Sequence, residues 1–98
     1  MNKRIHILIG GSVHGVGFRM YAVDQAEDLS LTGWVRNRAD GKVEIVAEGE
    51  ESDIEAFLER CRTGHDAAVV AEVRTAYSEP TGEFDSFTIR YGSSMQGS

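Results

Sequence analysis

An alternating apolar run leads into a glycine-rich segment in the stretch Arg4-Ile5-His6-Ile7-Leu8-Ile9-Gly10-Gly11-Ser12-Val13-His14-Gly15-Val16-Gly17-Phe18-Arg19. The isoleucines at positions 5, 7 and 9 predict a strand over residues 4–10 with one buried face. Gly15 and Gly17 allow backbone conformations that other residues avoid, so that successive N–H groups can turn toward one point. The start of a following helix and the planar fork of Arg19 would both favour a bound phosphate. The stretch therefore fits an anion-binding loop, although taken alone it also fits an ordinary strand-to-helix turn with a surface arginine.

The rest of the chain alternates between strand and helix patterns. The predicted elements are an amphipathic helix over 18–29, strands over 31–38 and 42–48, a helix over 53–62, and strands over 67–77 and 87–91. Asp40-Gly41 lies between the second and third strands and predicts a hairpin with a tight primed turn. Ser52 and Glu55 match a capping box at the start of the second helix, and Gly64 is a natural stop for it.

This order of elements predicts the fold class. Strand–helix–strand crossovers have one hand, which places both helices on the same face of a sheet. We therefore expect an α+β protein, a ferredoxin-like two-layer sandwich of the split βαβ kind, with an antiparallel sheet of four to five strands and two helices on one face. A single domain over residues 1–92 and a flexible C-terminal tail over residues 93–98 are expected.

Composition limits the possible partners. The 98 residues carry 10 basic and 16 acidic side chains, and the net charge of −6 is unfavourable for binding nucleic acid. Cys61 is the single cysteine, so no intramolecular disulfide is possible, and it lies on the apolar stripe of the second helix, which predicts a buried hydrophobic role. We expect a cytoplasmic protein with no metal, no cofactor, no membrane segment and a monomeric state.

Asn37 is the second candidate site residue. It ends the predicted strand over residues 31–38, where an asparagine commonly belongs to the turn that follows. In the split βαβ topology, however, this strand and the strand that enters the glycine loop belong to one sheet. Asn37 could then face the loop.

These motifs together resemble one family. The runs Gly11-Ser12-Val13-His14-Gly15-Val16-Gly17-Phe18-Arg19, Leu29-Ser30-Leu31-Thr32-Gly33-Trp34-Val35-Arg36-Asn37 and Asp40-Gly41-Lys42-Val43-Glu44, with Gly49, closely resemble the acylphosphatases. The resemblance spans about residues 5–91. It implies a metal-independent hydrolase of the carboxyl-phosphate bond of acyl phosphates. By that resemblance Arg19 binds the phosphate, the backbone of Val13, His14, Gly15, Val16, Gly17 and Phe18 forms its cradle, and Asn37 holds the attacking water.

The chain departs from this family at a few positions. His14 stands where glutamine is usual, which suggests an altered pH dependence, and Ser30 stands where glycine is common. His65-Asp66 replaces a proline-containing turn. The main alternative function is a non-catalytic module that binds phosphate or carbamoyl phosphate, like the acylphosphatase-like domains of larger maturation proteins. An RNA-binding ferredoxin-like domain is a second alternative, which the acidic charge disfavours.

Overall fold

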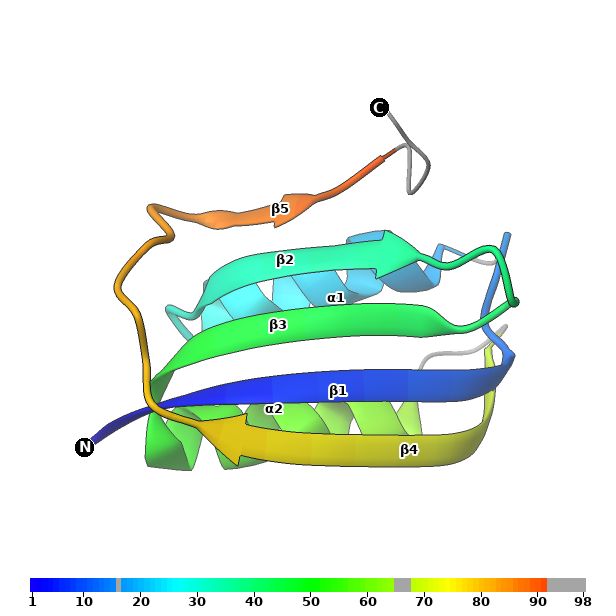
Figure 1. The fold of residues 1–98 in the computed structure, drawn as a ribbon. Helices are drawn as coiled ribbons and strands as arrows, with labels where there is room; N and C mark the ends of the chain where they lie inside the picture. Colours follow the sequence, from blue (N-terminus) through cyan, green and yellow to red (C-terminus); the bar gives the residue numbers. More distant parts are fainter. Residues whose placement is uncertain (16, 65–67, 92–98) are drawn as a thin grey trace.

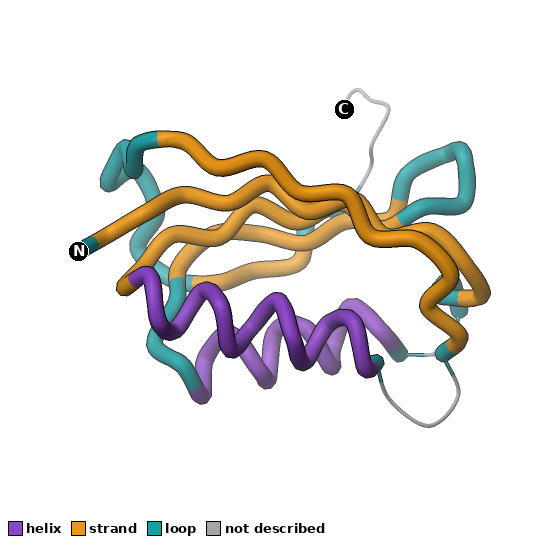
Figure 2. Tube along the Cα trace, turned by 90° about the horizontal axis from the view of Figure 1, so that it is seen from below, coloured by secondary structure: helices purple, strands orange, loops and turns teal. Residues whose placement is uncertain are grey.

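A five-stranded sheet covered on one face by two helices makes up the part of the chain that the structure describes (Figures 1 and 2). The computed structural model describes residues 1–15, 17–64 and 68–91. The elements are β1 (Asn2–Ser12), α1 (Phe18–Asp28), β2 (Thr32–Asn37), β3 (Val43–Glu50), α2 (Glu51–Thr63), β4 (Val69–Ser78) and β5 (Phe87–Ile89). Their order and layers confirm the predicted ferredoxin-like α+β fold. The predicted tail over 93–98 and the turn at His65-Asp66 lie outside the described residues.

The strands are ordered β4-β1-β3-β2-β5 across the sheet. The first four pair antiparallel, as predicted, but β5 pairs parallel to β2, so the sheet is mixed. Residues 79–86 carry the chain from β4 at one edge to β5 at the other (Figure 1). The backbone N–H of Arg90 then donates to the carbonyl of Val35 at 2.8 Å. The β2–β5 pairing therefore continues past the last residue of β5.

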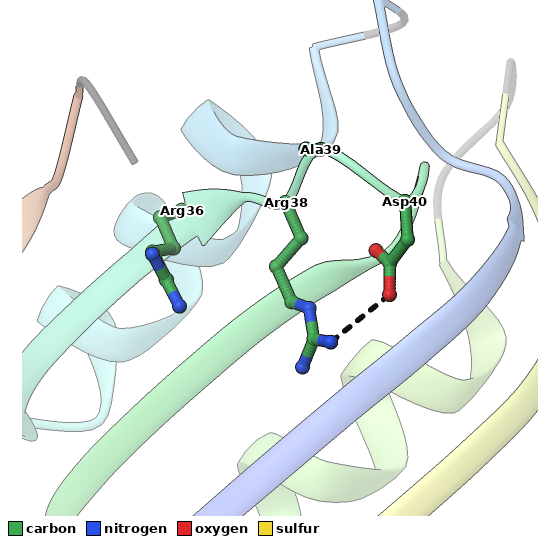
Figure 3. A pocket seen from close by; sticks show the side chains of 4 residues that line it. All are labelled: Arg36, Arg38, Ala39 and Asp40. Carbon is green, nitrogen blue, oxygen red and sulfur yellow. Dashed lines mark ion pairs between the residues drawn. The ribbon is translucent and has the colours of Figure 1, made fainter. Parts of the chain in front are cut away.

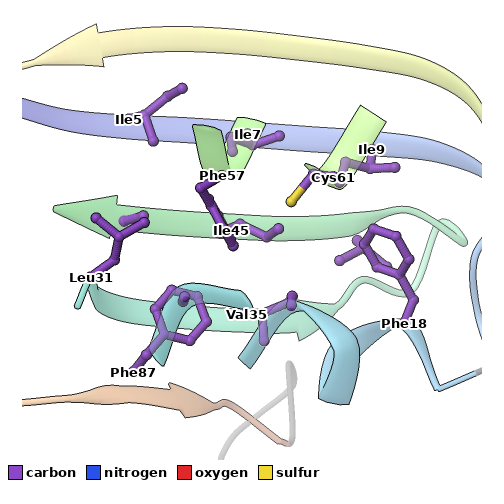
Figure 4. Packing of buried hydrophobic residues seen from close by; sticks show 14 of the residues in the cluster. Ile5, Ile7, Ile9, Phe18, Leu31, Val35, Ile45, Phe57, Cys61 and Phe87 are labelled. Carbon is purple, nitrogen blue, oxygen red and sulfur yellow. The ribbon is translucent and has the colours of Figure 1, made fainter. Parts of the chain in front are cut away.

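The core lies between the sheet and the helices (Figure 4). Its members are apolar side chains from both layers, among them Ile5, Ile7, Ile9, Val35 and Ile45 from the sheet and Phe18, Ala22, Ala26, Ile54, Phe57 and Cys61 from the helices. The alternation in β1 predicted its three isoleucines correctly. Cys61 is fully buried, and burial raises the pKa of its thiol to about 12, as expected for a small packing residue rather than a nucleophile.

The predicted capping box at the second helix is wrong. Glu50 is the N-cap of α2 and makes no side-chain capping hydrogen bond to the helix, and Ser52 lies inside the first turn. The reason is a long-range contact, because the backbone N–H of Glu51 donates to the carbonyl of Met1 at 3.0 Å. Strand β3 thus runs directly into the helix beside the start of β1. Gly64 ends the helix as predicted, with a φ of 72°.

The hairpin between β2 and β3 is present at Asp40-Gly41, as predicted. Arg38 and Lys42 close a three-residue loop, since the N–H of Arg38 donates to the carbonyl of Lys42 at 2.8 Å. The N–H of Gly41 donates to the carbonyl of Arg38 at 3.2 Å, and Gly41 has a φ of 90°. A three-residue loop with glycine in the left-handed region is the next most common hairpin connection.

In the described part of the chain, no helix is long and apolar enough to cross a membrane.

Candidate active site

The loop between β1 and α1 is fixed at both ends by buried side chains. Val13 and Phe18 are each only 1% exposed, so that only their backbone can face a ligand. Gly15 and Gly17 between them are exposed and have φ values of 69° and 77°. This left-handed conformation is favourable only for glycine, as the sequence predicted. Val16, also a predicted cradle residue, lies outside the described residues.

The N-terminus of α1 lies in this loop. Gly17 is its N-cap and offers no side-chain acceptor, and the first turn contains no acidic residue. The N–H of Tyr21 donates to the carbonyl of Gly17 at 3.0 Å, which places the first helical turn directly after the glycine. The positive end of the helix dipole is therefore not offset by a nearby carboxylate of its own first turn.

A small pocket opens between this loop and the end of β5. Its volume is about 110 Å³, and it is lined by Val13, Gly15, Gly17, Phe18, Arg19, Met20, Ile89 and Tyr91. A volume of this size holds roughly four water molecules at about 30 Å³ each. The pocket is therefore suited to a small group such as a phosphoryl group. Four of the predicted cradle residues and Arg19 meet there.

Arg19 supplies the positive charge of this pocket. Its side chain is half-buried, and its guanidinium carbon lies 5.4 Å from the centre of the Tyr91 ring. Within the described ranges, no carboxylate lies at ion-pairing distance from Arg19. A cation held by an aromatic ring and not neutralised by a carboxylate remains available to an anionic ligand.

A second, more open pocket contains arginines that are paired with carboxylates (Figure 3). It measures about 390 Å³ and is lined by Arg36, Arg38, Ala39 and Asp40. Arg38 pairs with Asp40 at 3.0 Å, as Figure 3 shows, and Arg36 pairs with Glu44 at 2.6 Å. Both guanidinium groups are already neutralised. The smaller pocket around Arg19 is therefore the better anion site.

Asn37 is the last residue of β2, and this end of β2 lies at the same end of the sheet as the end of β1, where the glycine loop begins (Figure 1). Along β2, Gly33, Val35 and Asn37 alternate onto the face that the helices cover, and the first two are buried. Asn37 is aligned with Val43 in β3, which is aligned with Ile9 in β1, shortly before the loop. These registers place Asn37 on the helix-covered face near the start of the loop, but Asn37 is not among the residues that line the small pocket.

The side-chain oxygen of Asn37 is in an unusual state. Oδ1 is buried, and it has no hydrogen-bond partner among the residues that the structure describes. An unsatisfied buried acceptor costs about 1–3 kcal/mol, so native proteins rarely keep one without a purpose or a bound water. The atom is therefore a candidate acceptor for a water or ligand donor.

The His14 side chain makes a contact that the sequence did not indicate. Its Nε2 lies 3.0 Å from the carbonyl oxygen of Lys42, in the β2–β3 hairpin. The side chain is not among those lining the small pocket. His14 therefore joins the loop to the hairpin, while its backbone belongs to the loop.

A sequence model of the acylphosphatase family matches residues 5–89 of the chain. The chain belongs to the acylphosphatase family. Acylphosphatase from Moorella thermoacetica is 52% identical over 87 residues, which cover 89% of this chain and 92% of that relative. The structure of acylphosphatase from Bacillus subtilis matches with a TM-score of 0.88 and 36% identity, covering 91% of this chain and 99% of that one. Full-length HypF, in a phosphate- and nucleotide-bound form, matches with a TM-score of 0.85 and 33% identity over 93% of this chain, but only 12% of HypF is covered.

Family and fold together support hydrolysis of acyl phosphates, and they place this acylphosphatase-family chain among the hydrolases that act on these small substrates. Sequence reasoning nevertheless missed Tyr91 as a neighbour of Arg19. The alternation of Phe87, Ile89 and Tyr91 indicated a strand but gave no signal for the ring that contacts Arg19, because that contact depends on where β5 lies beside α1.

Proposed function

We propose that the chain hydrolyses acyl phosphates to a carboxylate and inorganic phosphate, without a metal ion, by in-line attack of a water molecule. Arg19 and the backbone of residues 13–18 bind the phosphoryl group, and Asn37 positions the water through Oδ1. The buried Oδ1 without a hydrogen-bond partner among the described residues is the observation that supports hydrolysis rather than binding alone. A module that only bound phosphate would have no need of this acceptor.

The substrate's own chemistry explains why so few residues suffice. The leaving group is a carboxylate with a low pKa, which departs without protonation, so no general acid is required. The P–O bond to the water forms while the P–O bond to the acyl group breaks, and the water's proton passes to a phosphoryl oxygen. The protein then has two tasks, which are to stabilise charge on the phosphoryl oxygens and to place the water in line.

Arg19 also makes a metal ion unnecessary for the first task. Its guanidinium, which no carboxylate of the described residues pairs with, and the N-terminus of α1 both place positive charge at one small pocket. We further propose a cytoplasmic location, because Cys61, the single cysteine of the sequence, is a free thiol buried in the core. A monomeric state is part of the same proposal.

Hydrolysis of acetyl phosphate in the presence of a chelator tests the function. Wild-type protein should turn over at a rate that the chelator does not change. Arg19→Ala should lose on the order of 10²–10³ in rate, as for the loss of one preorganised electrostatic donor. Arg19→Lys should restore little, because the bidentate fork is gone. Arg74→Ala is a matched control, since Arg74 is exposed and paired with Glu72 in β4, and it should keep the wild-type rate.

Two results would contradict this assignment. Hydrolysis by Arg19→Ala at the wild-type rate would show that Arg19 does not bind the phosphoryl group. Phosphate binding without turnover by the wild-type protein would favour the alternative, a non-catalytic phosphate or carbamoyl-phosphate module. The likeness to HypF in a phosphate- and nucleotide-bound form gives that alternative its support.

A further inference from the structure

One carbonyl oxygen lies between the two halves of the candidate site. The oxygen of Lys42 accepts a hydrogen bond from the backbone N–H of Arg38 at 2.8 Å and lies 3.0 Å from Nε2 of His14. Arg38 directly follows Asn37, and His14 belongs to the phosphate-binding loop. We propose that His14 is a positioning residue, which sets the placement of Asn37 relative to the loop through the Lys42 carbonyl. This inference rests on the proposed function.

The hairpin transmits such a contact directly to Asn37. Asn37 and Val43 form the last aligned pair of β2 and β3, and Arg38 and Lys42 follow that pair and close the three-residue loop. The Lys42 carbonyl closes this loop through Arg38, so a shift of this carbonyl displaces Arg38 and, through the chain, the adjacent Asn37. A displacement of about 1 Å at a reacting group can cost on the order of 10²-fold in rate. Small shifts of the hairpin therefore matter for turnover.

The loop needs such a contact because its own backbone is permissive. Val13 and Phe18 are buried at its ends, whereas Gly15 and Gly17 have left-handed conformations and carry no side chain to hold them. A Cβ at Gly15 would meet nothing within 4 Å, so packing does not restrain that part of the loop. Among the side-chain hydrogen bonds of the described residues, that of His14 joins this loop to the hairpin.

The chemistry of the contact defines which residues can replace His14. A carbonyl oxygen only accepts, so Nε2 of His14 must carry the proton. The neutral tautomer protonated at Nε2 and the charged imidazolium both supply it. The primary amide of glutamine is also a donor of similar reach, whereas alanine supplies none. The structure therefore predicts that His14→Gln keeps the function of His14 and His14→Ala loses it.

Loss of the His14 contact should lower kcat and leave the inhibition constant of inorganic phosphate nearly unchanged. For His14→Ala we expect kcat to fall about fivefold, the equivalent of one ordinary hydrogen bond, while the inhibition constant of inorganic phosphate changes less than about twofold. His14→Gln should restore kcat to within about twofold of wild type. His6→Gln is the matched control, because His6 pairs with Glu44 at 2.6 Å, outside the small pocket, and it should leave both constants unchanged. Thermal unfolding should confirm that all variants fold, since the His14 side chain is exposed.

A second measurement keeps this test independent of the proposed function. In ¹⁵N-labelled protein, the side-chain amide signals of Asn37 and the backbone amide signal of Arg38 should shift in His14→Ala and return in His14→Gln. Unchanged signals in His14→Ala would overturn the proposal, whether or not the protein is an enzyme. Unchanged kcat in His14→Ala, or equal losses in kcat and in phosphate affinity, would also overturn it. If the wild-type protein shows no turnover, the proposed function is refuted. The amide signals alone then test whether His14 positions Asn37.

Discussion

Replacing Asn37 by alanine should separate catalysis from stability. The change removes Oδ1, a buried acceptor without a partner in the described part of the chain, and an atom in that state costs the folded protein about 1–3 kcal/mol. Relief of this cost offsets the packing that the half-buried side chain loses. The free energy of unfolding should therefore stay within about 1 kcal/mol of wild type, and the thermal midpoint within roughly 4–8 °C.

Catalysis should respond very differently to the same change. If Oδ1 positions the attacking water, its loss should lower kcat by on the order of 10²–10³, which is about 2.7–4 kcal/mol of transition-state stabilisation. Inorganic phosphate should still bind, because Arg19 and the loop are intact. The assay compares kcat with acetyl phosphate, the inhibition constant of phosphate and the unfolding free energy for Asn37→Ala. Asn2→Ala is the control, since Asn2 is exposed at the start of β1.

A structural role for Asn37 would give a different set of results. A fall of more than about 2 kcal/mol in unfolding free energy, with turnover and phosphate affinity lost in parallel, would indicate an asparagine that holds the hairpin. Wild-type turnover in a stable Asn37→Ala protein would show that another group positions the water. Either result would refute the argument from the buried oxygen.

Three further changes test other contacts of the structure. Tyr91→Leu should weaken phosphate inhibition by roughly twofold to fivefold, the worth of an exposed cation–π contact of about 0.5–1 kcal/mol with Arg19, and Tyr91→Phe should restore it. Burial acts to raise the pKa of Glu48, but hydrogen bonds from Thr81, Gly82 and Arg4 outweigh it and lower that pKa. The stability that Glu48 contributes is fully present above the pKa of glutamate in the unfolded chain, about 4.3, and is lost as pH falls through the lower pKa of Glu48 in the folded protein. The free energy of unfolding in urea should therefore fall on acidification. Glu48→Gln should reduce that dependence and cost about 1.5–3 kcal/mol at pH 7. Ser30 has a φ of 58°, and Ser30→Gly should stabilise the protein by about 0.5–1 kcal/mol in a thermal melt.

Local patterns predicted the parts of the fold that depend on nearby residues. The spacing of Ile5, Ile7 and Ile9 was enough to predict the buried face of β1, because alternation follows from strand geometry alone. Gly41 marked the hairpin because its positive φ is a local requirement. The capping box failed because Met1, 50 residues earlier in the chain, satisfies the N–H of Glu51. A sequence window around the helix does not contain that partner.

The parallel addition of β5 had no comparable local signal. Residues 79–86 must pass from one edge of the sheet to the other before β5 can pair with β2. Buried Glu48 holds the start of this passage, through hydrogen bonds from the backbone N–H groups of Thr81 at 2.8 Å and Gly82 at 3.0 Å. A glutamate in a strand normally indicates a solvent-exposed face, so its role depends on the assembled sheet. The same passage brings Tyr91 to Arg19.

The register of β2 connects the core to the site. Gly33, Val35 and Asn37 share the helix-covered face, while Trp34 and Arg36 lie on the other face, where the ring of Trp34 contacts Arg36 and Arg90. A slip of one residue would exchange the two faces, exposing Val35 and moving Asn37 to the face that the helices do not cover. Burial of Val35 in the core therefore also fixes the direction of Asn37. The fold class and this register place Asn37 on the helix-covered face, whereas the state of its oxygen required the structure, and a role for Asn37 beside the loop stays a prediction.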